Sequence, residues 1–329
     1  MNSSLEPQRD VRLPAKKILI IYNARSGHRR VNFKSYLQAL AERGAQVEMR
    51  MIGRDFNLVK LLEDAKVFDR VVVAGGDGTA ATAAGILQKT GIAVMAYPGG
   101  TANLLARNLN IPSEHGALAE LTLNGPTVQA DLGELEYIRY YRSDRLRQRF
   151  LKRTPQRLPV KIYFTVMAGC GFAARLMSEA RPLKPAWGEA AYWISALWNF
   201  FPRNADFVLH LDGREVRVRG IAVLVVNFAK IQFDIKLVSG GDSQDGKFEV
   251  VVLKARSLFG LVPVLWSAVV ERLGFKRHAV PEVMETYHAA EIEVRCNPPL
   301  KLQFDGEMLK KTSGFRIRAC RRAALFVHG

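Results

Sequence analysis

The chain has 329 residues, of which 48% are hydrophobic and 24% are charged, a balance typical of a globular protein and not of a disordered one. Its longest apolar stretch, Leu258–Val270, is interrupted by Pro263 and is too short for the roughly 20 residues of a membrane-spanning helix. The formal net charge of +17 favours contact with a polyanion, either nucleic acid or an anionic membrane surface.

The three cysteines, Cys170, Cys296 and Cys320, lie far apart and show neither a disulfide framework nor metal-ligand spacing. Residues 1–15 are polar and mixed in charge, without the apolar core of a signal peptide, and we expect them to form a disordered lead-in. These features predict a protein of the reducing cytosol that reaches a membrane only from its surface.

From residue 16 to about residue 127, apolar strands alternate with helical patterns, which predicts an α/β layer with a parallel sheet. The strands are expected at 18–22, 47–52, 71–74 and 92–97, and the helices up to residue 40 and at 58–65, 80–87 and 102–109. Three turns rich in Gly or Ser each follow a strand. Because ligands bind at the carboxyl edge of an open parallel sheet, we expect these turns to gather there.

The central stretch is Val71–Thr79, which reads VVVAGGDGT. A strand without a polar face leads into Gly75–Thr79 and then into an Ala-rich helix, an arrangement that directs bare amides and the positive end of a helix dipole at one anion. Glycines allow close backbone approach and positive φ. Asp77, an acid inside an anion-binding turn, suits a bound Mg²⁺ or a hydroxyl proton that must be removed.

After residues 128–133 the apolar period changes to about two, and turn signals such as Asp212-Gly213, Asp245-Gly246 and Asp305-Gly306 separate the segments. This pattern predicts an antiparallel sheet or sandwich. The strands are expected at 162–166, 207–211, 215–219, 222–227, 248–253, 291–295 and 300–304, with a turn at Asn297-Pro298-Pro299 and helices around 189–200 and 258–273.

Two segments of this half favour a membrane-facing surface. The stretch 139–161 carries nine basic residues against one acidic residue, and six aromatic residues crowd positions 187–201. Aromatic side chains beside a basic run are typical of interfacial membrane contacts. The alternative is a solvated basic loop and an aromatic core helix.

The motifs NARSG (23–27), GGDGT (75–79), PGGTAN (98–103), DLG (131–133), AGCGFAA (168–174) and the Asp-Gly pairs at 245 and 305 follow one another in the order seen in the diacylglycerol kinase catalytic superfamily. The resemblance spans roughly residues 16–326. It implies an α/β nucleotide-binding domain and a β-sandwich lipid domain, with the active site in the cleft between them. Residues 16–128 and 308–329 would form the first domain and residues 129–307 the second, with 317–327 returning as a strand.

The resemblance also implies ATP, Mg²⁺ and transfer of the γ-phosphoryl group to a lipid hydroxyl. ATP phosphates would lie on the second and third motifs, the first motif would hold the nucleotide, and Arg25 would act as a phosphate cation. The residues expected to bind ATP are Asn23, Arg25, Ser26, Gly27, Gly75, Gly76, Asp77, Gly78, Thr79, Gly99, Gly100, Thr101 and Asn103.

Phosphoryl transfer needs positioning, a cation for the developing charge and a carboxylate near the attacking hydroxyl. The candidate catalytic carboxylates are Asp77, Asp131 and Glu307. The resemblance implies that Asp131 or Glu307 is the general base and that Asp77 organises Mg²⁺ or shares that role. Asp245 is similar to a structural metal or network position, and a plain hairpin turn is its alternative.

The chain departs from the superfamily pattern in secondary positions. Thr82 stands where a Glu is usual in the helix after the signature motif, Ala24 replaces the Pro of the first motif, and Leu104 follows Asn103 where Asp is common. These departures predict a divergent lipid kinase, with unusual substrate preference or weak activity.

Three other readings remain open: an NAD kinase, whose family also carries GGDG; a lipid- or nucleotide-binding protein without catalysis; and a nucleic-acid-binding protein suggested by charge alone. The last lacks any binding motif, so no nucleic acid is expected. The preferred prediction is a lipid kinase that is cytoplasmic and peripherally associated with an anionic membrane. The sequence leaves a homodimer open.

Overall fold

The computed structural model describes residues 15–24, 33–53, 57–100, 103–140, 157–171, 204–228, 244–254 and 284–329. The predictions for the lead-in, for most of the basic run, for the aromatic stretch and for the helices around 189–200 and 258–273 lie outside these residues. Among the helices described, none combines the length and apolarity needed to cross a bilayer.

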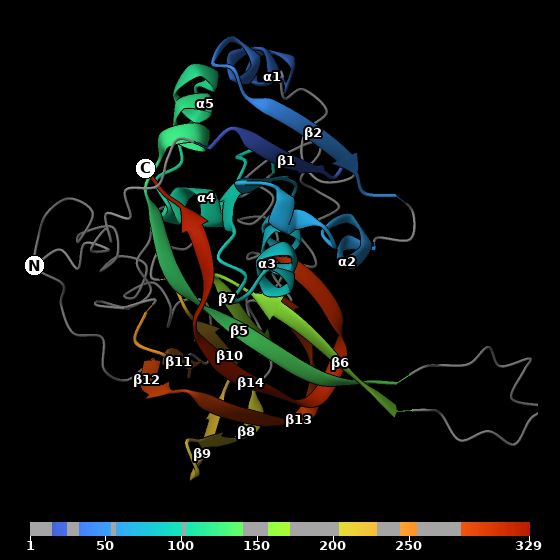
Figure 1. Ribbon diagram of the computed structural model, residues 1–329. Helices are drawn as coiled ribbons and strands as arrows, with labels where there is room; N and C mark the ends of the chain where they lie inside the picture. Colours follow the sequence, from blue (N-terminus) through green and yellow to red (C-terminus); the bar gives the residue numbers. More distant parts are fainter. Residues whose placement is uncertain are drawn as a thin grey trace, which may run out of the picture.

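The N-terminal part is a parallel sheet in the order β4-β3-β1-β2, covered by helices on both faces (Figure 1). Its strands are β1 (Lys17–Tyr22), β2 (Gln46–Met51), β3 (Arg70–Ala74) and β4 (Ala93–Ala96). The central strand β3 is buried along its whole length, as expected for a strand without a polar face. The predicted α/β layer is confirmed.

The helices of this part divide between the two faces of the sheet. They are α1 (Phe33–Glu42), α2 (Leu58–Leu61), the 3₁₀ helix η1 (Ala65–Val67), α3 (Asp77–Ile86), α4 (Leu104–Asn108) and α5 (His115–Asn124). Buried side chains of α1 and α5 pack on one face, and those of α2, α3 and α4 pack on the other. The helix predicted at 58–65 ends at Leu61, whose carbonyl oxygen accepts from Arg50, and Arg50 also donates to Asp64.

The C-terminal part is a mostly antiparallel β-sandwich around its own apolar core. Its strands are β5 (Thr127–Tyr140), β6 (Arg157–Phe164), β7 (Met167–Gly171), β8 (Ala205–Leu211), β9 (Arg214–Gly220), β10 (Ala222–Val226), β11 (Phe248–Leu253), β12 (Met284–Ala289), β13 (Glu291–Phe304) and β14 (Glu307–Val327). The predicted combination of an α/β domain and a sandwich is therefore confirmed, although β5, β7 and β12 were not predicted as strands.

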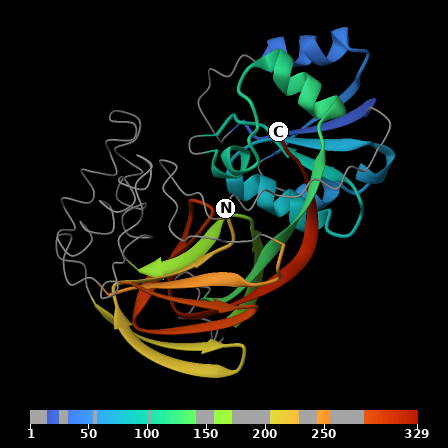
Figure 2. The same ribbon diagram turned by 90° about the vertical axis from the view of Figure 1, so that its left-hand side faces the viewer.

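Two long strands connect the parts. β14 begins in the sandwich, where it pairs with β13, and ends beside β4, with which Leu325 and Phe326 pair in parallel. β5 runs antiparallel to β14 along most of this path, and Figure 2 shows the two strands, green and red, passing together from the sandwich into the α/β part. The strand return predicted at 317–327 is present. The domain limits at residues 128 and 308 stay predictions.

The turn predicted at Asn297-Pro298-Pro299 is wrong. Residues 291–304 form one strand, β13, and the proline pair lies where its register with β14 shifts between Arg295 and Leu300. Proline lacks an N–H group and is tolerated in a strand at such irregularities, because no ladder hydrogen bond is required of it there.

Candidate active site

The connections of the parallel sheet diverge at its carboxyl edge between β1 and β3. The helix that follows β1 packs on one face and the helix that follows β3 packs on the opposite face, so the two chains diverge at the carboxyl edge. Such a switch point is where open α/β sheets bind ligands. Asn23, which follows β1, and Thr79, in α3, are joined there by a hydrogen bond of 3.3 Å from Nδ2 to Oγ1.

The Gly75–Thr79 turn leads directly into α3. Gly76 is the residue that precedes the helix, and no side chain caps this end. The first N–H groups of a helix have no partner within the helix, and together with the helix dipole they favour an anion. The predicted strand, turn and helix are all present, with α3 beginning at Asp77.

Close neighbours, and not a positive φ, distinguish three glycines of the two turns, at positions 75, 78 and 100. None of the described glycines at 75, 76, 78, 99 and 100 has positive φ, contrary to the expectation from sequence. A Cβ on Gly75 would lie 3.0 Å from the Cβ of Thr79. A Cβ on Gly100 would lie 2.9 Å from Oδ1 of Asn103 and 3.3 Å from the carbonyl oxygen of Gly75. The two glycine turns therefore touch each other.

Asn103 closes the second glycine turn. It has a left-handed backbone conformation, with φ of +49°, and its Oδ1 accepts the N–H of Gly100 at 2.7 Å while its Nδ2 donates to the carbonyl oxygen of Pro98 at 3.2 Å. Both polar atoms of the Asn103 side chain are therefore hydrogen-bonded within the turn. Four other predicted nucleotide ligands, Arg25, Ser26, Gly27 and Thr101, lie outside the described residues.

Asp77 joins the two turns from the first residue of α3. Its carboxylate oxygens accept the N–H groups of Leu104 at 3.1 Å and Leu105 at 3.0 Å, and so satisfy the start of α4. Burial raises the pKa of Asp77, and the two amides act in the opposite direction. Asp77 thus places a carboxyl group at the turn and also fixes the orientation of α4.

Glu307 reaches the same turn from the sandwich, from the first residue of β14. A Cβ on Gly78 would lie 3.1 Å from the Cγ of Glu307, so the Glu307 side chain packs directly against this glycine. Glu307 is exposed, and within the described part of the chain its carboxylate makes no hydrogen bond or ion pair. An accessible carboxylate therefore lies directly against the turn.

Asp305, two residues before Glu307, was quoted in a motif but not predicted as a site residue. Its buried carboxylate accepts the N–H groups of Thr165, Val166 and Met167 and the hydroxyl of Thr165, at 2.7 to 3.0 Å. Burial raises the pKa of Asp305 to about 6, with a smaller contribution from the charge of Asp77. Asp305 therefore anchors the turn that carries Glu307. In the sequence, only its position in the Asp-Gly-Glu motif indicated that this residue matters.

Asp131 does not face the glycine turn through its oxygens. They accept the N–H of Gly246 and the N–H of Arg322, each at 2.6 Å. Arg322 has φ of +46° and lies where β14 bends from the sandwich toward β4. Burial raises the pKa of Asp131 more than these two amides lower it. The carboxylate thus ties β5 to the bend of β14.

Asp245 is exposed beside this bend, and its Oδ1 accepts the N–H of Lys247 at 2.8 Å. Its charge contributes to the raised pKa of Asp131, so the two carboxylates are near each other. Across the described segments, no group of three or more His, Cys, Asp or Glu side chains converges as a metal site would require. The prediction that Asp245 binds a metal stays a prediction.

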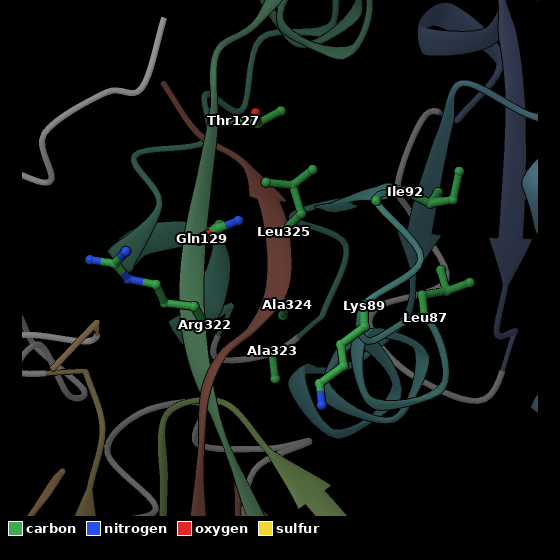
Figure 3. A pocket seen from close by; sticks show the side chains of 10 residues that line it. Leu87, Lys89, Ile92, Thr127, Gln129, Arg322, Ala323, Ala324 and Leu325 are labelled. Carbon is green, nitrogen blue, oxygen red and sulfur yellow. The ribbon is translucent and has the colours of Figure 1, made fainter. Parts of the chain in front are cut away.

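A separate hollow lies at the other end of α3, between the loop after this helix and the ends of β5 and β14 (Figure 3). Its lining residues are Leu87, Lys89, Gly91, Ile92, Thr127, Gln129, Arg322, Ala323, Ala324 and Leu325. In Figure 3 the side chains of Lys89 and Arg322 point in different directions and do not converge on one point. None of the predicted site residues lines this hollow.

Comparison with known families gives two matches that together cover most of the chain. Residues 17–135 match the diacylglycerol kinase catalytic domain. Residues 165–323 match the YegS C-terminal NAD kinase beta sandwich-like domain. The first match contains both glycine turns, and the second contains Asp305 and Glu307.

Among curated proteins, the chain is similar to a diacylglycerol kinase of Mycobacterium tuberculosis, with 24% identity over 302 residues and 88% of each chain covered. It is also similar to an uncharacterized protein of Synechocystis sp., with 23% identity over 245 residues, 74% of this chain and 51% of that protein.

Among solved structures, a diacylglycerol kinase of Bacillus anthracis str. Sterne has a TM-score of 0.64 at 15% identity and covers 96% of this chain and 97% of its own. A second structure from that organism has a TM-score of 0.69 at 16% identity, with 96% and 98% covered. At these identities the likeness establishes the fold.

Proposed function

The chain belongs to the diacylglycerol kinase catalytic superfamily, and from this membership and the geometry of the glycine turn we propose that it is an ATP-dependent lipid kinase. It transfers the γ-phosphoryl group to a hydroxyl of diacylglycerol or of a related, sphingoid-like lipid. The observation that carries the proposal is the contact of Glu307 with Gly78, which brings an accessible carboxylate to an uncapped helix N-terminus.

In this proposal Glu307 is the general base. A base must be within reach of the proton that it removes, and it must be accessible to the attacking hydroxyl. Glu307 is exposed and has no partner among the described side chains, whereas the oxygens of Asp131 and Asp305 are engaged by backbone amides. The geometry therefore favours Glu307 over Asp131 for the proton transfer.

The phosphates of ATP would lie on the amides of Gly75–Thr79 at the start of α3, next to the turn that Asn103 closes. Arg25, Ser26 and Gly27 follow β1 in the sequence, and we assign them to the same nucleotide. Asn23 holds Thr79 and thereby fixes the distance between β1 and α3. Its role is positioning.

Asp77 fits a magnesium ion that accompanies the nucleotide. Mg²⁺ is usually held by one or two carboxylates together with phosphate oxygens and water, so a full protein cage is not required. The Asp77 carboxylate is half-buried at the phosphate-binding turn, and each of its oxygens accepts a single hydrogen bond. When bound, the ion would neutralise charge that develops on the transferred group.

The lipid acceptor implies contact with a membrane surface. The net charge of +17 supports association with anionic lipid, and the basic stretch 139–161 and the aromatic residues at 187–201 supply suitable chemistry. Sedimentation with anionic vesicles tests this point. Binding should weaken as salt rises, and binding that ignores salt would argue against the electrostatic component.

A second candidate is a soluble kinase acting on NAD, since the match to residues 165–323 describes a sandwich like that of NAD kinase. A third is a catalytically weak lipid- or nucleotide-binding member, for which Thr82 is the supporting observation. The lipid kinase is preferred because the first match and the named curated relative are both diacylglycerol kinases.

The deciding experiment measures transfer of labelled phosphate from ATP to diacylglycerol, to sphingoid lipids and to NAD under the same conditions. Product on a lipid and none on NAD is expected. Product on NAD alone would replace the first candidate with the second. ATP binding without transfer to any acceptor would favour the third.

A further inference from the structure

The hairpin between β13 and β14 places an aromatic side chain beside Glu307. Phe304, the last residue of β13, pairs directly with Glu307, the first residue of β14. Residues directly opposite each other in an antiparallel pair direct their side chains to the same face. The two residues between them have positive φ, with Asp305 at +41° and Gly306 at +81°, as a tight two-residue hairpin turn requires. The turn therefore fixes Phe304 and Glu307 as neighbours.

The ring of Phe304 reaches the same glycine turn as the Glu307 side chain. A Cβ on Gly78 would lie 3.6 Å from Cε2 of Phe304 and 3.1 Å from Cγ of Glu307. The Phe304 side chain also packs against the apolar core of the sandwich and is only partly buried. An aromatic side chain thus extends from the sandwich core to the start of α3, next to the accessible carboxylate.

The chemistry at this position has two competing acceptors, a lipid hydroxyl and water. In transfer to a lipid, the hydroxyl oxygen bonds to the γ-phosphorus, the bond from that phosphorus to the oxygen bridging to the β-phosphate breaks, ADP leaves, and the hydroxyl proton passes to Glu307. In hydrolysis, water takes the place of the lipid hydroxyl in the same steps, and the product is inorganic phosphate. An exposed carboxylate accepts a proton from either acceptor, so the base alone does not select between them.

On the basis of the lipid kinase function proposed above, we propose that Phe304 is the residue that selects the lipid hydroxyl over water. Its ring forms an apolar wall of the acceptor site, which the carbon atoms next to a lipid hydroxyl can contact and which water cannot exploit. The ring also occupies space beside Glu307 that water would otherwise fill, and exclusion of water from a reaction site suppresses hydrolysis. Phe304 is thus a specificity-determining residue, whereas Glu307 takes the proton.

The test measures how each chain divides labelled γ-phosphate between lipid and water. The full chain is incubated with labelled ATP and dioleoylglycerol in mixed micelles, and the ratio of inorganic phosphate to lipid phosphate is determined. The wild-type chain should give mainly lipid phosphate. In Phe304→Ala the ratio should rise at least about tenfold, because even small differences in apolar contact change specificity by that factor. Both products come from the same active molecules, so the ratio does not depend on the fraction of chains that fold.

Leu300→Ala is the matched control. Leu300 lies on the same strand and packs against the same core, roughly 13 Å along β13 from Phe304, so its truncation weakens the core without removing the wall beside Glu307. Its ratio should equal that of the wild-type chain. Phe304→Leu keeps an apolar side chain on the core and should give a ratio between those of the wild type and Phe304→Ala.

The outcomes separate this proposal from the kinase function itself. A wild-type ratio in Phe304→Ala, with lipid phosphate still formed, would overturn the role of Phe304 and leave the lipid kinase in place. If Phe304→Ala does not fold, a wild-type ratio in Phe304→Leu has the same consequence. An equal rise in Leu300→Ala would also overturn it, because loosening of the sandwich core would then be the cause. A wild-type chain that forms no lipid phosphate would overturn the lipid kinase function and this proposal with it.

Discussion

The carboxylates of the sandwich interior differ from the carboxylate at the glycine turn in what their oxygens contact. Asp131 and Asp305 are buried, and each oxygen accepts at least one backbone N–H. Glu307 is exposed and makes no such bond within the described chain. Carboxylates therefore have two different roles in this chain. The buried acids hold strands and turns in register, and the exposed acid is available to accept a proton.

The strongest test of this separation is Glu307→Gln. Loss of a general base lowers the rate of transfer by about 10² to 10⁴-fold. Because the Glu307 side chain is exposed and unbonded in the described region, the free energy of unfolding should change by less than about 0.5 kcal/mol. Transfer from labelled ATP and urea unfolding measure the two quantities. A wild-type rate in Glu307→Gln would remove this residue from the mechanism.

The structural role of the buried acids is tested at Asp305, through the pH dependence of the free energy of unfolding. Its pKa is about 6 in the folded chain and 3.8 in its ordinary state, so between these values the folded chain binds more protons than the unfolded chain. The free energy of unfolding should therefore fall as pH rises from about 4 to about 6, by roughly 3 kcal/mol from this group.

Asp305→Asn keeps the shape of the side chain but cannot ionise, so it should lose this component of the pH dependence. The measurement is urea unfolding of both chains at intervals between pH 4 and pH 7, read as the difference between them. Other acids contribute equally to both chains and cancel. If the difference in free energy of unfolding between the two chains stays constant from pH 4 to pH 7, Asp305 keeps an ordinary pKa in the folded chain.

The packing between the two parts is tested by Gly85→Ala. Gly85 lies in α3 against the ring of Tyr163 from β6, and an added Cβ would come within 2.1 Å of that ring. The Tyr163 hydroxyl also accepts from Nε2 of Gln88 at 3.0 Å, so the ring is held in place. We expect Gly85→Ala to destabilise the fold by about 1 to 3 kcal/mol, although alanine alone would favour the helix.

A double variant gives the matched control. In a Tyr163→Ala chain the space above Gly85 is open, so adding Gly85→Ala should cause no further loss of stability. The wild-type chain, the two single variants and the double variant form a double-mutant cycle. Their free energies of unfolding, measured in urea, should give a large coupling energy between positions 85 and 163. Additive effects would show that the ring of Tyr163 does not limit position 85.

The features that sequence predicted well depend on neighbours in the chain. The strand, turn and helix of Val71–Ile86 follow from a buried apolar run, glycines and an Ala-rich segment, all within sixteen consecutive positions. The resemblance also named Glu307 as a candidate acid, and its catalytic role stays a prediction. Both predictions required only residue types and their order.

The features that sequence missed depend on distant partners. Asp131 bonds to an amide 115 residues away, and Asp305 bonds to a turn 140 residues away, so no local pattern distinguishes them from solvated turn acids. The continuity of β13 through its proline pair is set in the same way by pairing with β8 and β14. Local signals located the turn, and long-range hydrogen bonds determine which acids are bonded to the backbone and which one is left without such a bond in the described chain.

The smallest effect is expected at Thr82, where the superfamily commonly has Glu. The Thr82 hydroxyl donates to the carbonyl oxygen of Gly78 at 2.7 Å, one helical turn back, a bond within the helix that contributes little to its stability. Thr82→Ala should change the free energy of unfolding by less than about 0.5 kcal/mol and the transfer rate by less than about twofold. A tenfold loss of transfer at unchanged stability would instead place this hydroxyl in the phosphate site, because Gly78 is the residue against which Glu307 packs.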